Sequence, residues 1–170
     1  MKIVGICNKI IEFSFYSIFL LVPLVLWKNT SELFEFNKMW LTFGLTILIV
    51  FGWITKMVVL KKFWVQKTPL DIPIVIFLIS QIISTILSID PHTSIWGYYS
   101  RSNGGLLSLI AYLILYWALV SNFDKTQAIN FLKSAIFGGV IVSLWAIPEH
   151  FGASPSCLIL RGQFNADCWI

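Results

Sequence analysis

The sequence predicts an all-α protein, built as a polytopic bundle of about five transmembrane helices. Hydrophobic residues make up 58% of the 170-residue chain and charged residues only 12%, whereas soluble domains have about 45–50% and about 25%. The apolar residues form runs near the length of a membrane-spanning helix, and basic residues gather between alternate runs. This composition excludes a disordered chain, and three cysteines are too few for a disulfide scaffold.

The predicted spans follow one another along the chain with short linkers. They cover about residues 10–27, 39–60, 72–88, 105–121 and 128–148. The first is expected to be a retained signal-anchor helix with a kink at Pro23, because its run is long for a signal peptide and no cleavage site follows. Asp71 is a candidate N-cap of the third. The helices are therefore expected to form a bundle over residues 1–148, followed by a tail over 149–170.

The distribution of basic residues predicts the orientation of the bundle. With the N-terminus in the cytoplasm, the residues on the inner side are Lys2, Lys9, Lys56, Lys61, Lys62, Lys67, Lys125 and Lys133. Those on the outer side are Lys28, Lys38, Arg101 and Arg161. The tail is then expected outside the membrane. Since the basic residues form no dense patch, nucleic acid is not an expected partner.

The third predicted span carries a stripe of polar residues at helical spacing. Its members are Ser80, Gln81, Ser84, Thr85 and Ser88. The stripe is either the wall of a polar cavity that opens outward or a set of interhelical hydrogen bonds, and we favour the second. No charged residue lies at mid-membrane depth, which argues against a self-contained ion-coupled transporter.

No motif for soluble enzyme chemistry is present. Asp90, His92 and Ser94 are too close in sequence to converge as a catalytic triad. The polar residues of the tail have no recognised metal-ligand spacing, and the chain holds no P-loop, GxGxxG or HExxH. We expect neither a metal nor another cofactor.

The loop over residues 89–104 contains the most chemical information. Arg101 is expected at the outer membrane boundary, beside Trp96, Tyr98 and Tyr99. A fixed guanidinium at that depth binds a phosphate through two hydrogen bonds, and aromatic rings stack on sugars. The alternative is an aromatic belt with one interfacial arginine. Physical reasoning from these residues leaves both interpretations open.

The motif in this loop has a counterpart in a known family. The pattern Ser88-x-Asp90-x-x-x-Ser94-x-Trp96-Gly97, followed by Arg101-x-x-Gly104-Gly105, resembles the bacterial O-antigen ligase and Wzy-type O-antigen polymerase superfamily. The stretch Ala166-Asp167-Cys168-Trp169 is similar to that family's approach to its next span.

The resemblance implies the N-terminal part of a GT-C-type glycosyltransferase in the bacterial cytoplasmic membrane. Such enzymes build cell-envelope polysaccharide, moving a glycan from an undecaprenyl-type lipid diphosphate to an acceptor on the outer face. Arg101, Trp96 and Tyr98 are the candidate substrate-binding residues. The family's catalytic arginine and histidine lie in a large later loop that this chain lacks. The catalytic residues are therefore unassigned, and the chain is expected to be a fragment that packs against further C-terminal spans.

Two other functions fit the same sequence. One is a non-catalytic helical membrane subunit that packs against a partner, and the other is part of a transporter or flippase. In the tail, Cys157 and Cys168 would lie in a compartment where disulfides persist, whereas Cys7 would lie in the reducing cytoplasm. We favour a disulfide between Cys157 and Cys168 over two unpaired thiols.

Overall fold

The computed structural model describes residues 2–27, 35–99 and 102–162, and over these ranges the fold is all-helical, without strands. The elements are α1 (Lys2–Leu20), the 3₁₀ turn η1 (Val22–Leu24), α2 (Glu35–Leu60), α3 (Asp71–Ile86), α4 (Pro91–Trp96), α5 (Leu106–Asn122), α6 (Lys125–His150) and α7 (Pro155–Arg161). By length and composition, α2, α6 and α1 with its 3₁₀ turn are able to cross a membrane, and α3 and α5 are shorter apolar helices.

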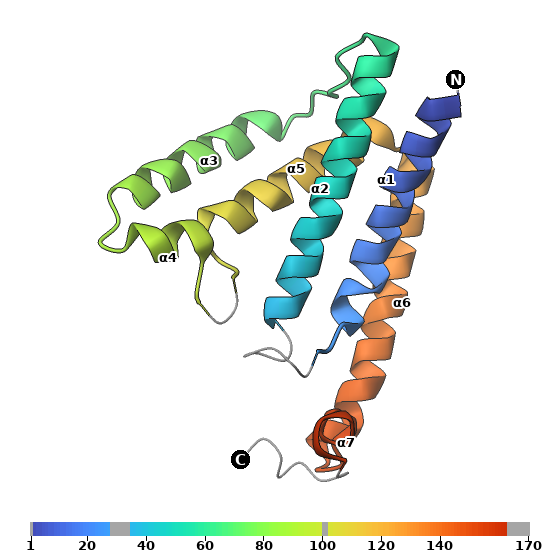
Figure 1. The fold of residues 1–170 in the computed structure, drawn as a ribbon, viewed down its shortest axis with the longest axis vertical. Coiled ribbons are helices and arrows are strands. Elements are labelled where there is room, and N and C mark those ends of the chain that lie inside the picture. The colour runs from blue at the N-terminus through green and yellow to red at the C-terminus, as the bar shows by residue number, and fades with distance from the viewer. Residues whose placement is uncertain (1, 28–34, 100–101, 163–170) are drawn as a thin grey trace.

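The hydrophobic core lies where α1, α2 and α6 meet the C-terminal half of α5. Its buried members are Ile11, Phe15, Ile49, Trp53, Ala118 and Phe131. The ring of Phe131 packs 5.7 Å from Phe15, 4.7 Å from Tyr16 and 4.9 Å from Phe123, measured between ring centroids. Most of these rings meet edge-on or tilted, which is the favourable geometry for aromatic pairs. In Figure 1, α1 lies between α2 and α6 around this core.

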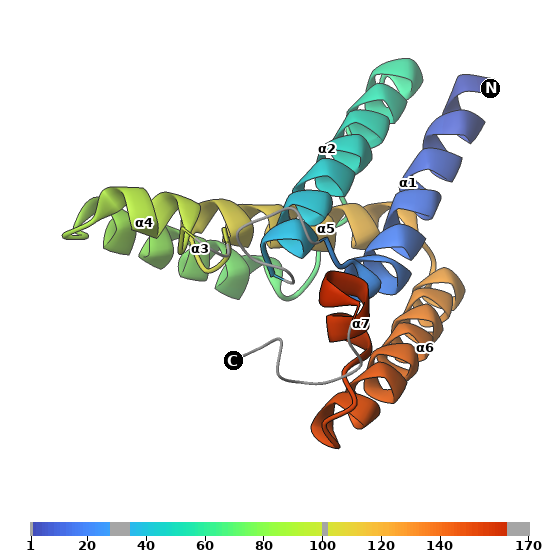
Figure 2. The same cartoon turned by 60° about the horizontal axis from the view of Figure 1, so that its bottom comes forward.

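Helices α3, α4 and α5 form an arm that extends away from this core. Figures 1 and 2 both show α3 and α5 running side by side at a steep angle to α1 and α2, with α4 at the far end. No residue of α3 is buried. The base of the arm is tied by hydrogen bonds from Trp117 Nε1 to Asp71 Oδ1 (3.0 Å) and between the hydroxyls of Thr68 and Tyr116 (2.9 Å).

The structure corrects several expected helix boundaries. Helix α1 begins at Lys2, well before the apolar run, and α6 spans Lys125–His150. The helices extend beyond the apolar runs because polar residues such as Lys, Asn and Gln are also compatible with helix. The α-helical part of α1 ends at Leu20, and Pro23 lies in the 3₁₀ turn that follows. A proline ring clashes with the carbonyl four residues earlier, which explains this end.

The prediction that Asp71 caps the third apolar helix is wrong. The N-cap of α3 is Leu70, and Asp71 is the first helical residue. Its carboxylate instead accepts hydrogen bonds from the backbone N–H of Thr68 (2.8 Å) and from its hydroxyl (2.7 Å). The side chain thus closes the turn before the helix, because Thr68 offers two donors within its reach.

Two short helices stand in segments for which the sequence analysis predicted a loop and a tail. The N-caps of α4 and α7 are Asp90 and Ser154, and each is followed by proline as the first helical residue. The capping side chains accept hydrogen bonds from the backbone N–H groups of Thr93 (3.2 Å) and Cys157 (3.1 Å). Proline suits this position because its missing N–H would have no partner there.

Candidate functional site

The motif residues of the 88–105 loop hold one another in place. The Asp90 carboxylate accepts hydrogen bonds from both the backbone N–H and the hydroxyl of Thr93. The Ser94 hydroxyl donates to the Ser88 hydroxyl (2.6 Å), which donates to the backbone carbonyl of Asp90 (3.2 Å). The side-chain bond from Thr93, followed by its backbone bond, lowers the pKa of Asp90 below its usual value. The spacing of the serines and the aspartate therefore builds and caps α4.

The glycines of the motif allow the loop to close on itself. Gly97 has φ 84°, and a Cβ there would lie 2.3 Å from the carbonyl oxygen of Asn103. A Cβ on Gly105 would lie 2.4 Å from the backbone nitrogen of Gly97. Both distances are too short for any side chain, since the obstructing atoms belong to the backbone. The part of the loop just before α5 thus packs against the end of α4 through a contact that only glycine permits.

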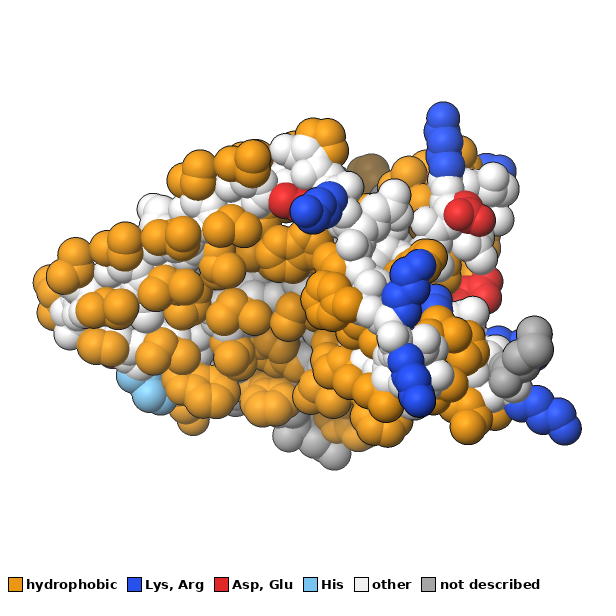
Figure 3. All heavy atoms as spheres, turned by 90° about the horizontal axis from the view of Figure 1, so that it is seen from above, with side chains coloured by type: hydrophobic (Ala, Val, Ile, Leu, Met, Phe, Trp, Pro, Cys, Tyr) orange, Lys and Arg blue, Asp and Glu red, His pale blue; other side chains and the backbone are white. Residues whose placement is uncertain are grey.

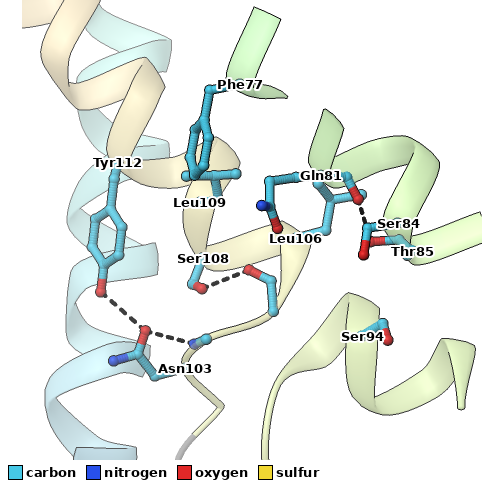
Figure 4. Close-up of a pocket in the computed structure, with 12 residues that line it drawn as sticks. Phe77, Gln81, Ser84, Thr85, Ser94, Asn103, Leu106, Ser108, Leu109 and Tyr112 are labelled. Carbon is cyan, nitrogen blue, oxygen red and sulfur yellow. Dashed lines mark hydrogen bonds between the residues drawn. The ribbon is translucent and has the colours of Figure 1, made fainter. Parts of the chain in front are cut away.

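A polar pocket of about 320 Å³ lies between α3, α4 and the start of α5 (Figure 4). Its polar lining consists of Gln81, Ser84, Thr85, Ser94, Asn103, Ser108 and Tyr112, and its apolar lining of Phe77, Leu106 and Leu109. Tyr112 Oη and the backbone N–H of Gly104 both donate to Asn103 Oδ1, at 3.3 and 2.8 Å. Among the described residues, no charged side chain lines the pocket. Such a lining suits a neutral ligand with several hydroxyl groups.

The polar stripe of the third apolar run takes part in this pocket. Gln81, Ser84 and Thr85 line it, whereas Ser80 does not. The Thr85 hydroxyl donates to the carbonyl of Gln81 on its own helix (2.8 Å). Ser88, the last member of the stripe, accepts a hydrogen bond from Ser94 of α4. Within the described residues, the stripe therefore contributes both to the pocket and to a contact with another helix, and the interpretation as interhelical hydrogen bonds stays a prediction. The side chains of Gln81 and Ser84 keep donors and acceptors available to a ligand.

An apolar groove lies beside the polar pocket, between α2 and α5. Its volume is about 700 Å³. It is lined by Trp40, Phe43, Thr46, Ile47, Val50, Phe51, Ile54, Trp96, Leu107, Ile110, Ala111 and Ile114. On the short helix α4, Ser94 lines the polar pocket while Trp96 lines this groove. The motif helix therefore separates a polar compartment from an apolar one.

The structure places the sequence-predicted residues unequally. Trp96 lies in the apolar groove, while Tyr98 is 72% exposed and lines neither the groove nor the pocket. Arg101 lies outside the described residues. The sequence analysis missed Ser108 and Tyr112, whose pocket-facing positions had a signal: two polar residues four apart in an apolar run share one helix face.

The end of α6 forms a compact turn with α7. One oxygen of the Glu149 carboxylate, Oε1, accepts hydrogen bonds from the Ser154 hydroxyl (3.2 Å) and from the Ser156 backbone N–H (3.3 Å). Cys157 is buried and disulfide-bonded, and Cys7 is a free thiol. Cys168 lies outside the described residues, so its pairing stays a prediction. Over the described ranges, no three His, Cys, Asp or Glu side chains are grouped so that they could hold a metal ion.

No protein-family model, curated protein or solved structure matches the chain.

Proposed function

We propose that the chain is the N-terminal membrane portion of a bacterial glycan ligase or polymerase. It would take part in transferring a glycan from a lipid-diphosphate carrier to an acceptor on the outer face of the cytoplasmic membrane. The single observation behind this proposal is the pair of compartments at the motif helix, with Ser94 facing the polar pocket and Trp96 the apolar groove. A lipid-linked glycan has the same two parts, joined by its diphosphate.

The proposal assigns each part of the carrier to one group of residues. The sugar hydroxyls exchange hydrogen bonds with Gln81 and Ser84, and the hydrocarbon chain lies in the groove beside Trp96. Arg101 binds the diphosphate through its planar guanidinium, and the exposed ring of Tyr98 stacks on a sugar. In the reaction, an acceptor hydroxyl attacks the anomeric carbon and the diphosphate leaves with the bonding electrons. Cationic groups favour this step by stabilising the negative charge of the leaving group.

The proposed topology has five spans, with the N-terminus in the cytoplasm. Helices α1, α2 and α6 have the length for direct crossing. With 16 and 17 residues, α3 and α5 are about 24–26 Å long, somewhat short of the ~30 Å hydrocarbon core. Short spans are accommodated by local thinning of the bilayer or by packing against neighbouring helices. Reporter fusions after Lys62 and after Ser100 are expected to lie inside and outside, respectively, and finding both on one side would contradict this topology.

The test is binding of a lipid-diphosphate-linked sugar to the 170-residue chain in uncharged detergent. We expect saturable binding that is stronger than binding of the same lipid as its monophosphate. Arg101→Ala should weaken it about 10- to 100-fold, which corresponds to the roughly 1.5–3 kcal/mol of a charge-assisted hydrogen bond. Arg101→Lys should lose less affinity than Arg101→Ala, since lysine keeps the charge but lacks the planar guanidinium that makes two parallel hydrogen bonds.

Matched variants test whether the motif and pocket residues bind the lipid-linked sugar specifically. Arg161→Ala removes the same side chain outside the motif and should leave binding unchanged. Ser84→Ala, in the pocket, should weaken binding, whereas Ser80→Ala, one turn away and outside it, should not. Equal effects of Arg101→Ala and Arg161→Ala, or no saturable binding at all, would contradict the proposal.

The second candidate is a non-catalytic membrane subunit. The observation that favours it is α3, an apolar helix without a single buried residue, which offers a long face to a partner helix. This function predicts that the chain binds no lipid-linked sugar. The same binding experiment therefore distinguishes the two candidates.

A further inference from the structure

The segment over residues 61–67 follows α2 on the way to α3 and has no helical structure, yet hydrogen bonds fix it to the fold. Trp53 Nε1 donates to the backbone carbonyl of Trp64 (3.1 Å), and Trp64 Nε1 donates to the carbonyl of Ser121. The backbone N–H of Gln66 donates to the Ser121 hydroxyl (3.0 Å). These bonds tie the segment, hereafter the strap, to α2 on one side and to the last turn of α5 on the other.

The strap presents basic and apolar side chains to the outside. Lys61, Lys62 and Lys67 are exposed, and the Phe63 side chain between them is 82% exposed. The Lys62 Nζ atom lies 5.1 Å from the centroid of the Trp64 ring, within cation–π range. An exposed phenylalanine beside lysines is unfavourable in water but suits the interface of a membrane with charged headgroups.

The backbone at Lys61 supports a role for its charge. This residue directly follows α2 and has φ 47°, in the left-handed region where glycine or asparagine is the usual choice. Lysine there costs backbone energy relative to glycine. Its presence keeps a third cation on the strap.

Other lysines lie at the same end of the molecule. Figure 3, which looks onto the end of the molecule where α2 stops and α1 starts, shows basic side chains gathered on one side and hydrophobic ones over the rest. The exposed lysines near the starts of α1 and α6 are Lys2, Lys9 and Lys125. The acidic residues of this end are Glu12, Asp71 and Asp124, of which Asp71 already accepts hydrogen bonds from Thr68 and Trp117. The end is therefore basic as a whole.

From these observations, we propose that the strap is a docking site for the anionic headgroups of the adjacent membrane leaflet. Lys61, Lys62 and Lys67 contact the headgroup phosphates, and the Phe63 ring inserts between the lipids at the interface. The hydrogen bonds from Trp53 and Trp64 fix the backbone that carries the lysines, so that little backbone freedom is lost on binding. The partner is the lipid surface, because a free phosphate ion would make no use of the exposed phenylalanine.

The test measures the selectivity of the whole chain for anionic lipid. The purified chain in uncharged detergent is titrated with phosphatidylglycerol or phosphatidylcholine, and displacement of a fluorescent phosphatidylglycerol is followed. We expect saturable preference for phosphatidylglycerol that weakens with added salt. Each lysine near an anionic surface contributes about a fivefold change in affinity, so the variant K61Q/K62Q/K67Q should lose about 100-fold.

Matched controls isolate the strap from the charge of the whole end. The variant K2Q/K9Q/K125Q removes three lysines of the same end outside the strap, and it should lose much less affinity. Lys61→Gly removes one cation and relieves the left-handed backbone, so it should lose about fivefold in affinity while its melting temperature stays equal or rises. Inorganic phosphate at the concentration of the lipid phosphate should not compete.

Three results would overturn the proposal. They are equal losses in the two triple variants, an unchanged affinity of Lys61→Gly, and competition by inorganic phosphate at that concentration. The outcome is independent of the proposed glycan function, because the strap lies outside the motif loop. Strap variants should keep the binding of lipid-diphosphate-linked sugar that depends on Arg101, and Arg101→Ala should keep the phosphatidylglycerol preference.

Discussion

The core around α1, α2 and α6 and the arm of α3, α4 and α5 are stabilised in different ways. In the core, Phe131 is 1% exposed and touches several aromatic rings. In the arm, α3 buries no residue, and hydrogen bonds at its two ends connect it to its neighbours. The chain therefore keeps its apolar packing and its polar site in different regions. The largest apolar contacts lie in the core, whereas the motif, the polar pocket and the glycine contacts lie in the arm.

The largest expected effect concerns the core. Phe131→Ala removes a buried ring and leaves a cavity among aromatic neighbours, so we expect a loss of about 3–5 kcal/mol in the free energy of unfolding. Phe137→Ala on the same helix removes a ring that is 60% exposed, and it should cost little. Unfolding in mixed micelles, followed by circular dichroism, measures both variants. Similar losses would show that the core is not where the helices are held together.

The second effect concerns the arm. Gly97→Ala places a methyl group against the Asn103 carbonyl and forces a left-handed alanine, which should cost about 3 kcal/mol locally. Amide hydrogen exchange in residues 88–105 should accelerate more than 100-fold, while exchange in the core stays unchanged. The control is Gly139→Ala in α6, where nothing lies within 4 Å of the added Cβ. It should be neutral or stabilising, because alanine favours helix over glycine.

Part of this division was predictable from the sequence. The apolar runs predict where the helices lie, because helices buried in lipid or in protein are rich in hydrophobic residues. The spacing of Gln81, Ser84 and Thr85 alone predicts that they share one polar face. Hydropathy does not predict the helix boundaries at Lys2 and Lys125, because it does not detect polar residues that continue a helix.

The remaining features of the fold and of the site depend on tertiary structure or on capping signals that hydropathy does not detect. The angle of the arm, and with it the two compartments on either side of α4, follows from packing between segments far apart in the chain. No spacing in the sequence shows that Ser94 and Trp96 face different cavities. The starts of α4 and α7, in contrast, have a local sequence signal. Asp90-Pro91 and Ser154-Pro155 each combine an N-cap residue with a proline at the first helical position.

The smallest expected effect tests the cap that holds the motif helix in the arm. Hydrogen bonds from Thr93 stabilise the Asp90 carboxylate and lower its pKa in the folded state. A group with a lowered folded pKa contributes stability that is present above its unfolded pKa, near 4, and is lost as the pH falls through the folded value. Protection of the α4 amides from hydrogen exchange, corrected for intrinsic rates, should therefore decrease below about pH 4. Asp90→Asn keeps a good capping side chain but cannot titrate, so its α4 protection should stay level over the same range. An equal decrease in the Asn variant would assign the pH dependence to another group. The cap would then hold α4 through hydrogen bonding alone, without a contribution from the charge of Asp90.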